Sequence, residues 1–312
     1  MRLRLEPGGL SLGCAPMGNL YRKVPDDDVA AVVHTAFERG VNLFDTAPHY
    51  GYGLSESRLG AALAGRPRDD YLLATKVGRL LLPVDQVGET DGDIFVGTPP
   101  VRSSFDFSAD GVRRSLEESL GRLGVDRVDI VHVHDPEDHL EQAITEAYPA
   151  LLGLRDEGVI DAVGLGTNFA EVAGAVLSRV DLDCILLAGR VTLLDDSGIA
   201  VLDRCAERNV SVFAAGVFNS GILADPSDGA HFHYEPASEE VLDRARTLQA
   251  VCEAHGTTVA AAALGRPRLH PAVATVVVGA ADAAELSADL DLAEAELPED
   301  LWGSLRAAGA AV

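Results

Sequence analysis

The sequence contains few cysteines and no long run of apolar residues. The four cysteines show no Cys-x-x-Cys spacing, and Cys184 and Cys205 lie within apolar or helical periodicity. We therefore expect buried free thiols, without disulfides and without a zinc site. No apolar run approaches the roughly 20 residues that span a bilayer. Residues 1–7 alternate Arg with Leu and lack the apolar centre of a signal peptide, so these absences predict a cytoplasmic protein.

Basic residues are also scarce. The chain has 25 Lys and Arg against 49 Asp and Glu, a formal net charge of -24 at pH 7. Such a chain is repelled by phosphate backbones and anionic lipids, which argues against nucleic acid and membrane surfaces as partners. Solvation of the surface explains the acidic excess. We expect a small-molecule partner, and a homo-oligomer is compatible with this composition.

Apolar residues, by contrast, make up 47% of the 312 residues, which is enough for a large core. Short apolar runs alternate with amphipathic stretches along the whole chain, as is typical of βα units. In the first helix, Asp26 is expected to cap the N-terminus and Gly40 to end the helix. We expect one domain over residues 1–312, with strands at residues 10–15, 41–45, 71–76, 128–134, 162–166, 184–188, 210–215 and 274–278.

Eight strand-helix units favour a closed (β/α)8 barrel, the TIM barrel. The alternative is a doubly wound open sheet, whose nucleotide-binding form carries Gly-x-Gly-x-x-Gly after an early strand. That pattern follows none of the expected strands. In a barrel the chemistry gathers at the carboxyl ends of the strands. The two long connections, residues 78–107 and 224–238, leave from that end, so we interpret them as substrate or cofactor lids.

Four polar residues stand at the ends of three consecutive strands. Asp45 closes the second strand and Tyr50 follows five residues later. The third strand ends in Lys76, which is costly in an apolar run unless a carboxylate pairs with it, and Asp45 is the obvious partner. His132 and His134 are two residues apart in the fourth strand, so they lie on the same face, with His134 nearer the mouth. We assign His132 to a hydrogen-bonded core.

These residue types suit hydride transfer at a carbonyl or its reverse, because a proton must move to or from the substrate oxygen. A free phenol titrates near ~10, and we expect the Lys76 ammonium to lower the pKa of Tyr50 toward neutrality. Asp45 would hold the lysine. A neutral His134 would position the carbonyl oxygen by a hydrogen bond.

Each of these residues also has a purely structural interpretation. Asp45 could cap a turn, and the Lys76 side chain could extend from the strand end to solvent. Tyr50 could pack against a loop, and His134 could be a core residue. The His-x-His pair is compatible with a metal ligand set, but no further ligand lies at a suitable spacing, so we expect no metal. The order Asp, Tyr, Lys, His at consecutive strand ends favours catalysis over these separate interpretations.

With this order, the sequence resembles the aldo-keto reductase superfamily, whose catalytic tetrad has the same four residue types. The stretches LGCAPMGNLY, FDFSADGVRRSLEESLGRLGVDRVDIVHVHDPE, VTLLD and VFNSGIL are similar to the branch that contains L-fucose, D-threo-aldose 1- and pyridoxal 4-dehydrogenases. The resemblance covers nearly the whole chain. It implies an NAD(P)-dependent enzyme with Asp45, Tyr50, Lys76 and His134 as the catalytic residues.

The resemblance also implies cofactor-binding positions. Thr167 and Asn168 take the place of a Ser-Asn pair that holds the nicotinamide amide, while Ala188 and Val191 replace a glutamine and a tyrosine near the ring. A loop with exposed amides, suited to a pyrophosphate, is implied at Val217, Phe218, Asn219, Ser220 and Gly221. The adenine end is implied at Gly279, Ala280, Asp282 and Glu285.

The adenine end bears on the choice of cofactor. NADP-preferring relatives carry Lys or Arg there, where this chain has Gly279 and Glu285. A carboxylate repels a 2'-phosphate and accepts a hydrogen bond from a free 2'-hydroxyl, so NAD is expected rather than NADP. The alternative is that Glu285 is a solvated residue on a surface helix.

Aromatic and polar residues of the loops suit a sugar or pyridoxal, although each also suits loop packing. They are Tyr21, His49, Tyr52, Phe105, Phe107 and His233. The resemblance implies oxidation of an aldose of the L-fucose or D-threo type at C1 to a lactone, with Tyr50 as general acid/base. The alternatives are a pyridoxal dehydrogenase, a biosynthetic carbonyl reductase, or a cofactor-binding regulatory module without fast turnover.

Overall fold

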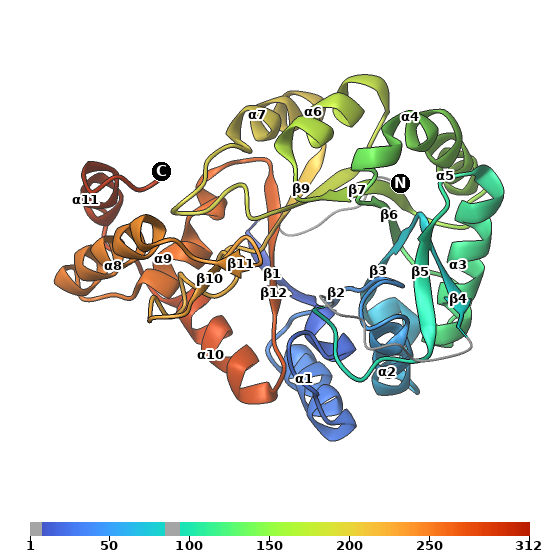
Figure 1. Cartoon of the computed structure of the whole chain (residues 1–312), viewed down its shortest axis with the longest axis horizontal. Coiled ribbons are helices and arrows are strands. Elements are labelled where there is room, and N and C mark those ends of the chain that lie inside the picture. Colours follow the sequence, from blue (N-terminus) through green and yellow to red (C-terminus); the bar gives the residue numbers. More distant parts are fainter. Residues whose placement is uncertain (1–7, 85–93) are drawn as a thin grey trace.

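The computed structural model describes residues 8–84 and 94–312. Eight parallel strands close into a barrel in the order β1-β12-β9-β8-β7-β6-β3-β2 (Figure 1). Each expected strand is present in the expected order, so the predicted (β/α)8 barrel is confirmed. The barrel strands are β1 (Gly9–Gly13), β2 (Leu43–Asp45), β3 (Leu72–Val77), β6 (Ile130–His134), β7 (Ala162–Thr167), β8 (Cys184–Ala188), β9 (Ser211–Ala215) and β12 (Val273–Gly279).

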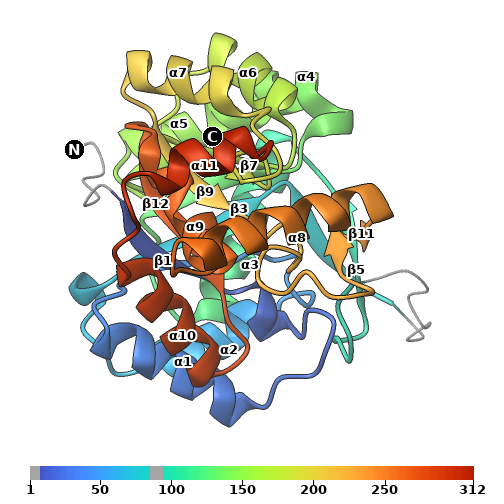
Figure 2. The same ribbon diagram turned by 90° about the vertical axis from the view of Figure 1, so that its left-hand side faces the viewer.

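Helices cover the outside of the barrel, and α8, α9 and α11 lie together on one side (Figure 2). None of the described helices is long and apolar enough to cross a membrane. The α-helices are α1 (Asp26–Glu38), α2 (Leu54–Leu63), α3 (Ala109–Leu123), α4 (Leu140–Gln142), α5 (Tyr148–Asp156), α6 (Ala170–Arg179), α7 (Ile199–Arg208), α8 (Glu239–Ala254), α9 (Val259–Gly265), α10 (Ala283–Glu294) and α11 (Leu301–Ala307). Short turns of helix complete the set: η1 (Ala15–Gly18), η2 (Arg68–Asp70), η3 (Glu137–His139), η4 (Ala143–Ala147, a π-helix) and η5 (Pro267–Leu269).

The start of α1 corrects one prediction. Pro25, with extended backbone, occupies the N-cap position, and Asp26 is the first helical residue without a side-chain cap. The Asp26 carboxylate pairs with Arg58 Nε at 2.7 Å instead, which takes it away from the helix amides. The acidic residues of the first turn still oppose the positive end of the helix dipole.

The two long connections each contain a small antiparallel pair of strands. One holds β4 (Arg79–Pro83) and β5 (Val101–Phe105), and the other holds β10 (His231–Phe232) and β11 (Glu235–Pro236). Both follow the carboxyl end of a barrel strand. Side chains from these connections therefore lie at the end of the barrel where the tetrad was predicted.

Inward-facing side chains fill the barrel, and a larger apolar layer separates its strands from the helices. All four cysteines are buried and free, as predicted. The barrel interior is packed by Leu43, Ala74, Ile130, Ala162, Cys184, Leu186, Phe213 and Val277.

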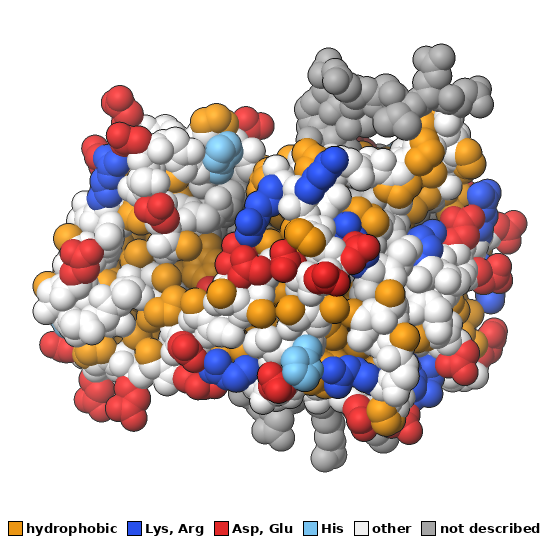
Figure 3. Space-filling model, turned by 90° about the horizontal axis from the view of Figure 1, so that it is seen from below, with side chains coloured by type: hydrophobic (Ala, Val, Ile, Leu, Met, Phe, Trp, Pro, Cys, Tyr) orange, Lys and Arg blue, Asp and Glu red, His pale blue; other side chains and the backbone are white. Residues whose placement is uncertain are grey.

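The acidic excess lies on the surface. Figure 3 shows Asp and Glu side chains spread over one face, with Lys and Arg side chains among them. Arg39, for example, donates to Asp291 at 2.8 Å and to Glu294 at 3.4 Å, and both carboxylates are exposed. This distribution fits the interpretation that the net charge serves solvation.

Candidate active site

A buried ion pair lies at the carboxyl ends of β2 and β3. Lys76 Nζ donates to Asp45 Oδ2 at 2.6 Å and to the carbonyl oxygen of Thr46 at 2.9 Å, and both side chains of the pair are almost fully buried. Burial alone would lower the pKa of Lys76, but the Asp45 carboxylate and Tyr50 raise it above its usual value. The barrel therefore holds a lysine cation beneath its mouth, as predicted.

The Tyr50 ring lies over this cation. Lys76 Nζ is 4.6 Å from the ring centroid, so the cation lies against the face of the phenol. The turn that carries Tyr50 is packed against η1, because a Cβ on Gly18 or on Gly51 would come within 2.6 Å of the opposite backbone. Gly51 also has a φ of +62°, which favours glycine. This contact fixes the height of Tyr50 above the ion pair.

The expected lowering of the pKa of Tyr50 is wrong for the chain by itself. Burial raises this pKa above the ordinary value of 10.0, and the Lys76 ammonium offsets only part of the rise. The nearby Asp45 carboxylate adds to the rise, because it disfavours a second negative charge. Tyr50 is thus a protonated phenol at neutral pH, and further positive charge nearby is needed to favour the phenolate form that can accept a proton.

His134 ends β6 and faces Tyr50. The two rings are edge to face with centroids 5.9 Å apart, and His134 is buried. Burial, reinforced by Lys76 and Arg79, lowers the pKa of His134 well below 6.5, so the ring is neutral as predicted. Its Nδ1 is buried without a hydrogen-bond partner, and its Nε2 is 3.4 Å from Asp135 Oδ2. A neutral imidazole at this place can position a substrate oxygen.

His132 lies deeper in the same strand and is fully buried, as predicted. The expectation that it is hydrogen-bonded is wrong, because neither ring nitrogen makes a regular hydrogen bond. Its ring packs against Phe213 at 5.8 Å and Nε2 is 3.9 Å from Asp45 Oδ1. Burial and Lys76 lower its pKa to about 3. His132 is thus a neutral, buried side chain that packs beneath the ion pair.

The structure places the predicted substrate residues in different parts of the mouth. His49 lies between Tyr52 and Phe95, both at 5.6 Å, and 6.2 Å from His134. His49 thus lies beside the predicted catalytic residues. Tyr21 is half exposed and lies on the loop after β1.

Phe105 and Phe107 differ from each other. Their rings stack at 5.7 Å, and the Phe105 ring is partly exposed beneath the Arg79 guanidinium. Phe107 is fully buried against Gly78, so its prediction as a lining residue is wrong. Its side chain supports Phe105 from the core instead.

Several polar residues of the mouth were missed from the sequence. Arg79 donates to Asp135 at 2.9 Å beside His134. Arg190 pairs with Asp195 at 2.9 Å and contacts the predicted residue His233 at 3.0 Å. Asp135 directly follows His134 and has a φ of +45°, but sequence periodicity does not reveal such backbone geometry.

A pocket of about 170 Å³ lies beside the tetrad at the ends of β7, β8 and β9. Thr167 donates its hydroxyl proton to Glu137 Oε1 at 2.5 Å and accepts from the Phe169 amide at 3.1 Å. The oxygen of Thr167 therefore keeps one lone pair to accept from a ligand amide. The pocket is lined by Asn168, Phe169, Ala188, Gly189, Arg190, Gly216, Asn219, Ser220, His233 and Tyr234.

The predicted pyrophosphate loop follows β9. The amides of Asn219 and Gly221 bond to carbonyl oxygens within the turn. Those of Val217, Phe218 and Ser220 donate to no group in the described part of the chain. Of the five expected amides, these three remain available to an anion.

The predicted adenine end lies where β12 meets α10. Asp282 caps α10 by accepting from the amides of Ala284 and Glu285. Glu285 is already engaged, because it accepts from Arg22 at 2.5 Å and from the Ala281 amide at 2.8 Å. We expected the Glu285 carboxylate to be free for the ribose. Its partner Arg22 is 263 residues away in the sequence, so no local pattern indicates the pair.

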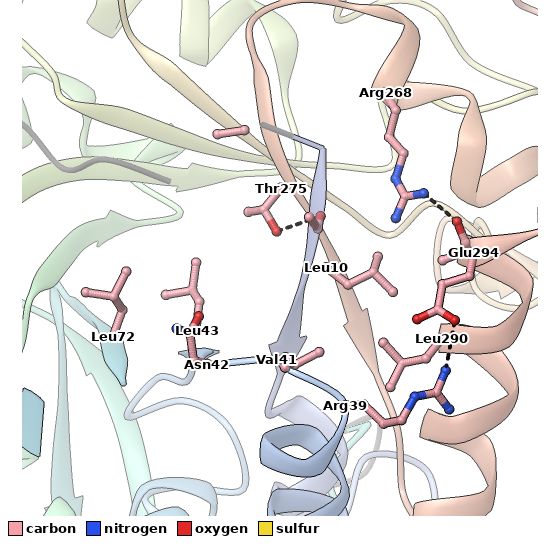
Figure 4. A pocket seen from close by; sticks show the side chains of 14 residues that line it. Leu10, Arg39, Val41, Asn42, Leu43, Leu72, Arg268, Thr275, Leu290 and Glu294 are labelled. Atoms are coloured by element: carbon pink, nitrogen blue, oxygen red, sulfur yellow. Dashed lines mark hydrogen bonds and ion pairs between the residues drawn. The ribbon is translucent and has the colours of Figure 1, made fainter. Parts of the chain in front are cut away.

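A second pocket, of about 500 Å³, opens at the opposite end of the barrel (Figure 4). It lies at the amino ends of β1, β2, β3 and β12 and contains no tetrad residue. Arg39 and Arg268 lie at its rim and Leu10 and Thr275 on its wall. The four predicted catalytic residues and the cofactor candidates all lie at the other end.

Comparison with known proteins agrees with this geometry. The aldo/keto reductase family model matches residues 9–310, and the chain belongs to this family. The D-threo-aldose 1-dehydrogenase of a Pseudomonas species is 41% identical over 304 residues, covering 95% of this chain and 92% of the relative. Pyridoxal 4-dehydrogenase of Microbacterium luteolum is 35% identical, covering 99% and 96%.

Solved structures show the same fold. The aldo-keto reductase AKR11C1 from Bacillus halodurans, in its holo form, superposes with a TM-score of 0.78 at 25% identity, covering 99% of this chain and 96% of the other. Membership of the family makes this chain an oxidoreductase, and aldo-keto reductases use a nicotinamide cofactor.

Proposed function

We propose that this chain oxidises an aldose at C1 to the lactone with NAD, and that Tyr50 exchanges the proton of the C1 hydroxyl. The observation that carries the proposal is the buried Asp45–Lys76 pair at 2.6 Å beneath the Tyr50 ring. A cation in this position stabilises the phenolate form of Tyr50, which is the form that can accept the C1 hydroxyl proton. The 41% identical relative, a D-threo-aldose 1-dehydrogenase, supports the substrate class.

The residues beside the tetrad fit a nicotinamide cofactor. Ala188, Gly189 and Gly216 are small and leave the pocket open, and the Asn168 side chain makes no hydrogen bond within the described part of the chain. The three unbonded amides after β9 suit a pyrophosphate. When bound, the cofactor supplies the hydride acceptor, and its oxidised ring brings a positive charge to the mouth.

In the proposed mechanism the chain's own residues handle the proton. His134 orients the C1 oxygen by a hydrogen bond, and Tyr50 Oη takes up the hydroxyl proton. Lys76 stabilises the phenolate that receives this proton, and Asp45 keeps the lysine charged and in place. Reduction is the second candidate, because the raised pKa of Tyr50 makes it a ready proton donor in the chain by itself.

Steady-state rates with NAD and NADP, in both directions, test the proposal. The panel is L-fucose, D-arabinose, pyridoxal and a simple aliphatic aldehyde. We expect the highest kcat/KM for NAD-linked oxidation of an aldose, with a lactone as product. If only pyridoxal or only the aldehyde is turned over, that compound replaces the aldose as the proposed substrate. Cofactor binding with no turnover across the panel would indicate a regulatory module.

A further inference from the structure

The charged side chains around the mouth are arranged in pairs. Lys76 pairs with Asp45 at 2.6 Å, and Arg79 with Asp135 at 2.9 Å. On the cofactor side, Arg190 pairs with Asp195 at 2.9 Å. Each of these cations is offset by a carboxylate at hydrogen-bond distance, so the three pairs contribute little net charge to the mouth.

Glu137 is different. It is partly buried on the turn after β6, and it forms no ion pair within 4.0 Å of a basic side chain in the described part of the chain. Its side-chain hydrogen bond comes from a neutral group, the Thr167 hydroxyl at 2.5 Å. Burial raises the pKa of Glu137 above its usual value, and the Thr167 hydrogen bond and the more distant Arg79 guanidinium offset only part of this rise. Glu137 therefore adds to the rim of the mouth a carboxylate that no basic side chain in the described part of the chain pairs with directly.

The position of Glu137 relates it to the reacting ring. Register pairs His134 of β6 with Gly166 of β7, so Thr167 follows the residue opposite His134 on the adjacent strand, whose backbone is about 4.8 Å away. Hydride transfer needs the reacting atoms within about 3–3.5 Å of each other. Asn168, which directly follows Thr167, lines the pocket at the ends of β7, β8 and β9, so a nicotinamide ring bound in this pocket next to Tyr50 and His134 would lie near the Thr167–Glu137 pair.

We infer that Glu137 makes the site favour the oxidised, cationic nicotinamide ring over the reduced, neutral one. The ring loses its positive charge when it accepts a hydride, so an unpaired carboxylate near it stabilises only the oxidised form. The preference concerns which redox form of the cofactor binds more tightly. It is independent of the substrate and goes beyond the proposed aldose oxidation.

Cofactor binding measures this preference without turnover. The dissociation constant of NADH is measured by its fluorescence on binding, and that of NAD by displacement of NADH. Glu137→Gln removes the charge but keeps an oxygen that accepts from Thr167. We expect the Kd of NAD to rise about tenfold in this variant, while the Kd of NADH changes less than twofold.

Two further variants separate charge from structure. Glu137→Asp keeps the carboxylate and is expected to retain the ratio of the two Kd values within about threefold of wild type. Glu146→Gln removes an exposed carboxylate on the following helix and should leave both constants unchanged. A melting curve of each variant checks that it is folded.

Two results would overturn the inference. One is an unchanged Kd for NAD in Glu137→Gln. The other is an equal weakening of NAD and NADH, which would make Glu137 only a support for Thr167. Neither result depends on the sugar, whereas the proposed function fails if no aldose is oxidised. The two failures can therefore be told apart.

Discussion

Two ion pairs at the carboxyl-terminal end of the barrel have nearly the same distance between their charged atoms and opposite surroundings. Lys76 and Asp45 are 2.6 Å apart with side chains 1% and 3% exposed, whereas Arg22 and Glu285 are 2.5 Å apart with side chains 59% and 48% exposed. Distance alone does not distinguish them. Burial decides what each pair can do, because water screens the outer pair and not the inner one.

The inner pair is a fixed part of the barrel. Neither partner can lose its charge or its position without leaving the other unpaired in a dry interior. The outer pair is exchangeable, because water or a ligand can replace either partner at small cost. A permanent charge under Tyr50 suits repeated proton transfer, and an exchangeable charge beside α10 suits ligand selection.

Breaking the inner pair should have the largest effect. Lys76→Met leaves the Asp45 carboxylate buried without a partner, so we expect the free energy of unfolding to fall by about 3–5 kcal/mol. Oxidation should be lost as well, because the phenolate of Tyr50 loses its counter-charge. Urea unfolding followed by circular dichroism measures the first effect. A variant within about 1 kcal/mol of wild type would show that the inner pair is no more critical than an exposed one.

Burial should also decide how a histidine affects the pH dependence of stability. The pKa of His132 is lowered to about 3, so the folded state does not bind a proton as the pH falls below about 6.5, whereas the unfolded state does. Stability is therefore present above pH 6.5 and is lost below it, at up to about 1.4 kcal/mol per pH unit from this group.

The variants His132→Gln and His34→Gln test this difference, because His34 is exposed on α1. Unfolding is measured from pH 7 to pH 4 in both. Only His132→Gln should reduce the loss of stability with falling pH. Equal slopes in the two variants would argue against a proton-excluding site at His132.

Opening the outer pair should shift cofactor choice by a moderate amount. Glu285→Gln removes the nearer of the two carboxylates that face Arg22 and leaves Asp282 at 3.8 Å, so Arg22 can pair with a 2'-phosphate and we expect the Kd of NADPH to fall about tenfold. Fluorescence titration with NADPH and NADH measures the shift. The double variant Arg22→Gln with Glu285→Gln should lose this gain, and a gain that persists would exclude Arg22 as its source.

The smallest effect is expected on the free energy of unfolding when the Arg22–Glu285 pair is broken. Arg22→Gln breaks an exposed ion pair, so the free energy of unfolding should change by less than about 1 kcal/mol. Thermal unfolding at low and high salt measures it. A loss as large as that of Lys76→Met would mean that the outer pair is structurally as important as the inner one.

The sequence was sufficient for the fold and for the inner pair. Period and turn residues predicted each barrel strand, and an isolated Lys76 at a strand end required the carboxylate that Asp45 provides. These features depend on local pattern and on the rule that parallel strands end together. His134 was placed correctly beside Tyr50 for the same reason.

The missed features depend on burial and on distant partners. The pKa of Tyr50 rises because its ring is enclosed by loops, and enclosure cannot be derived from residue types. Arg22 and Glu285 are 263 residues apart, and nothing local connects them. Phe107 was placed in the mouth because aromatic residues suit both a binding site and a core, and only packing against Gly78 distinguishes the two.

The central claim is that Tyr50 moves the substrate proton above the buried Lys76. Tyr50→Phe removes one hydroxyl and keeps the ring, so kcat for the best aldose and the Kd of the cofactor test the claim together. We expect kcat to fall by about 10²–10⁴-fold, with the Kd of the cofactor within about twofold of wild type. A variant with a near-normal kcat would contradict the account.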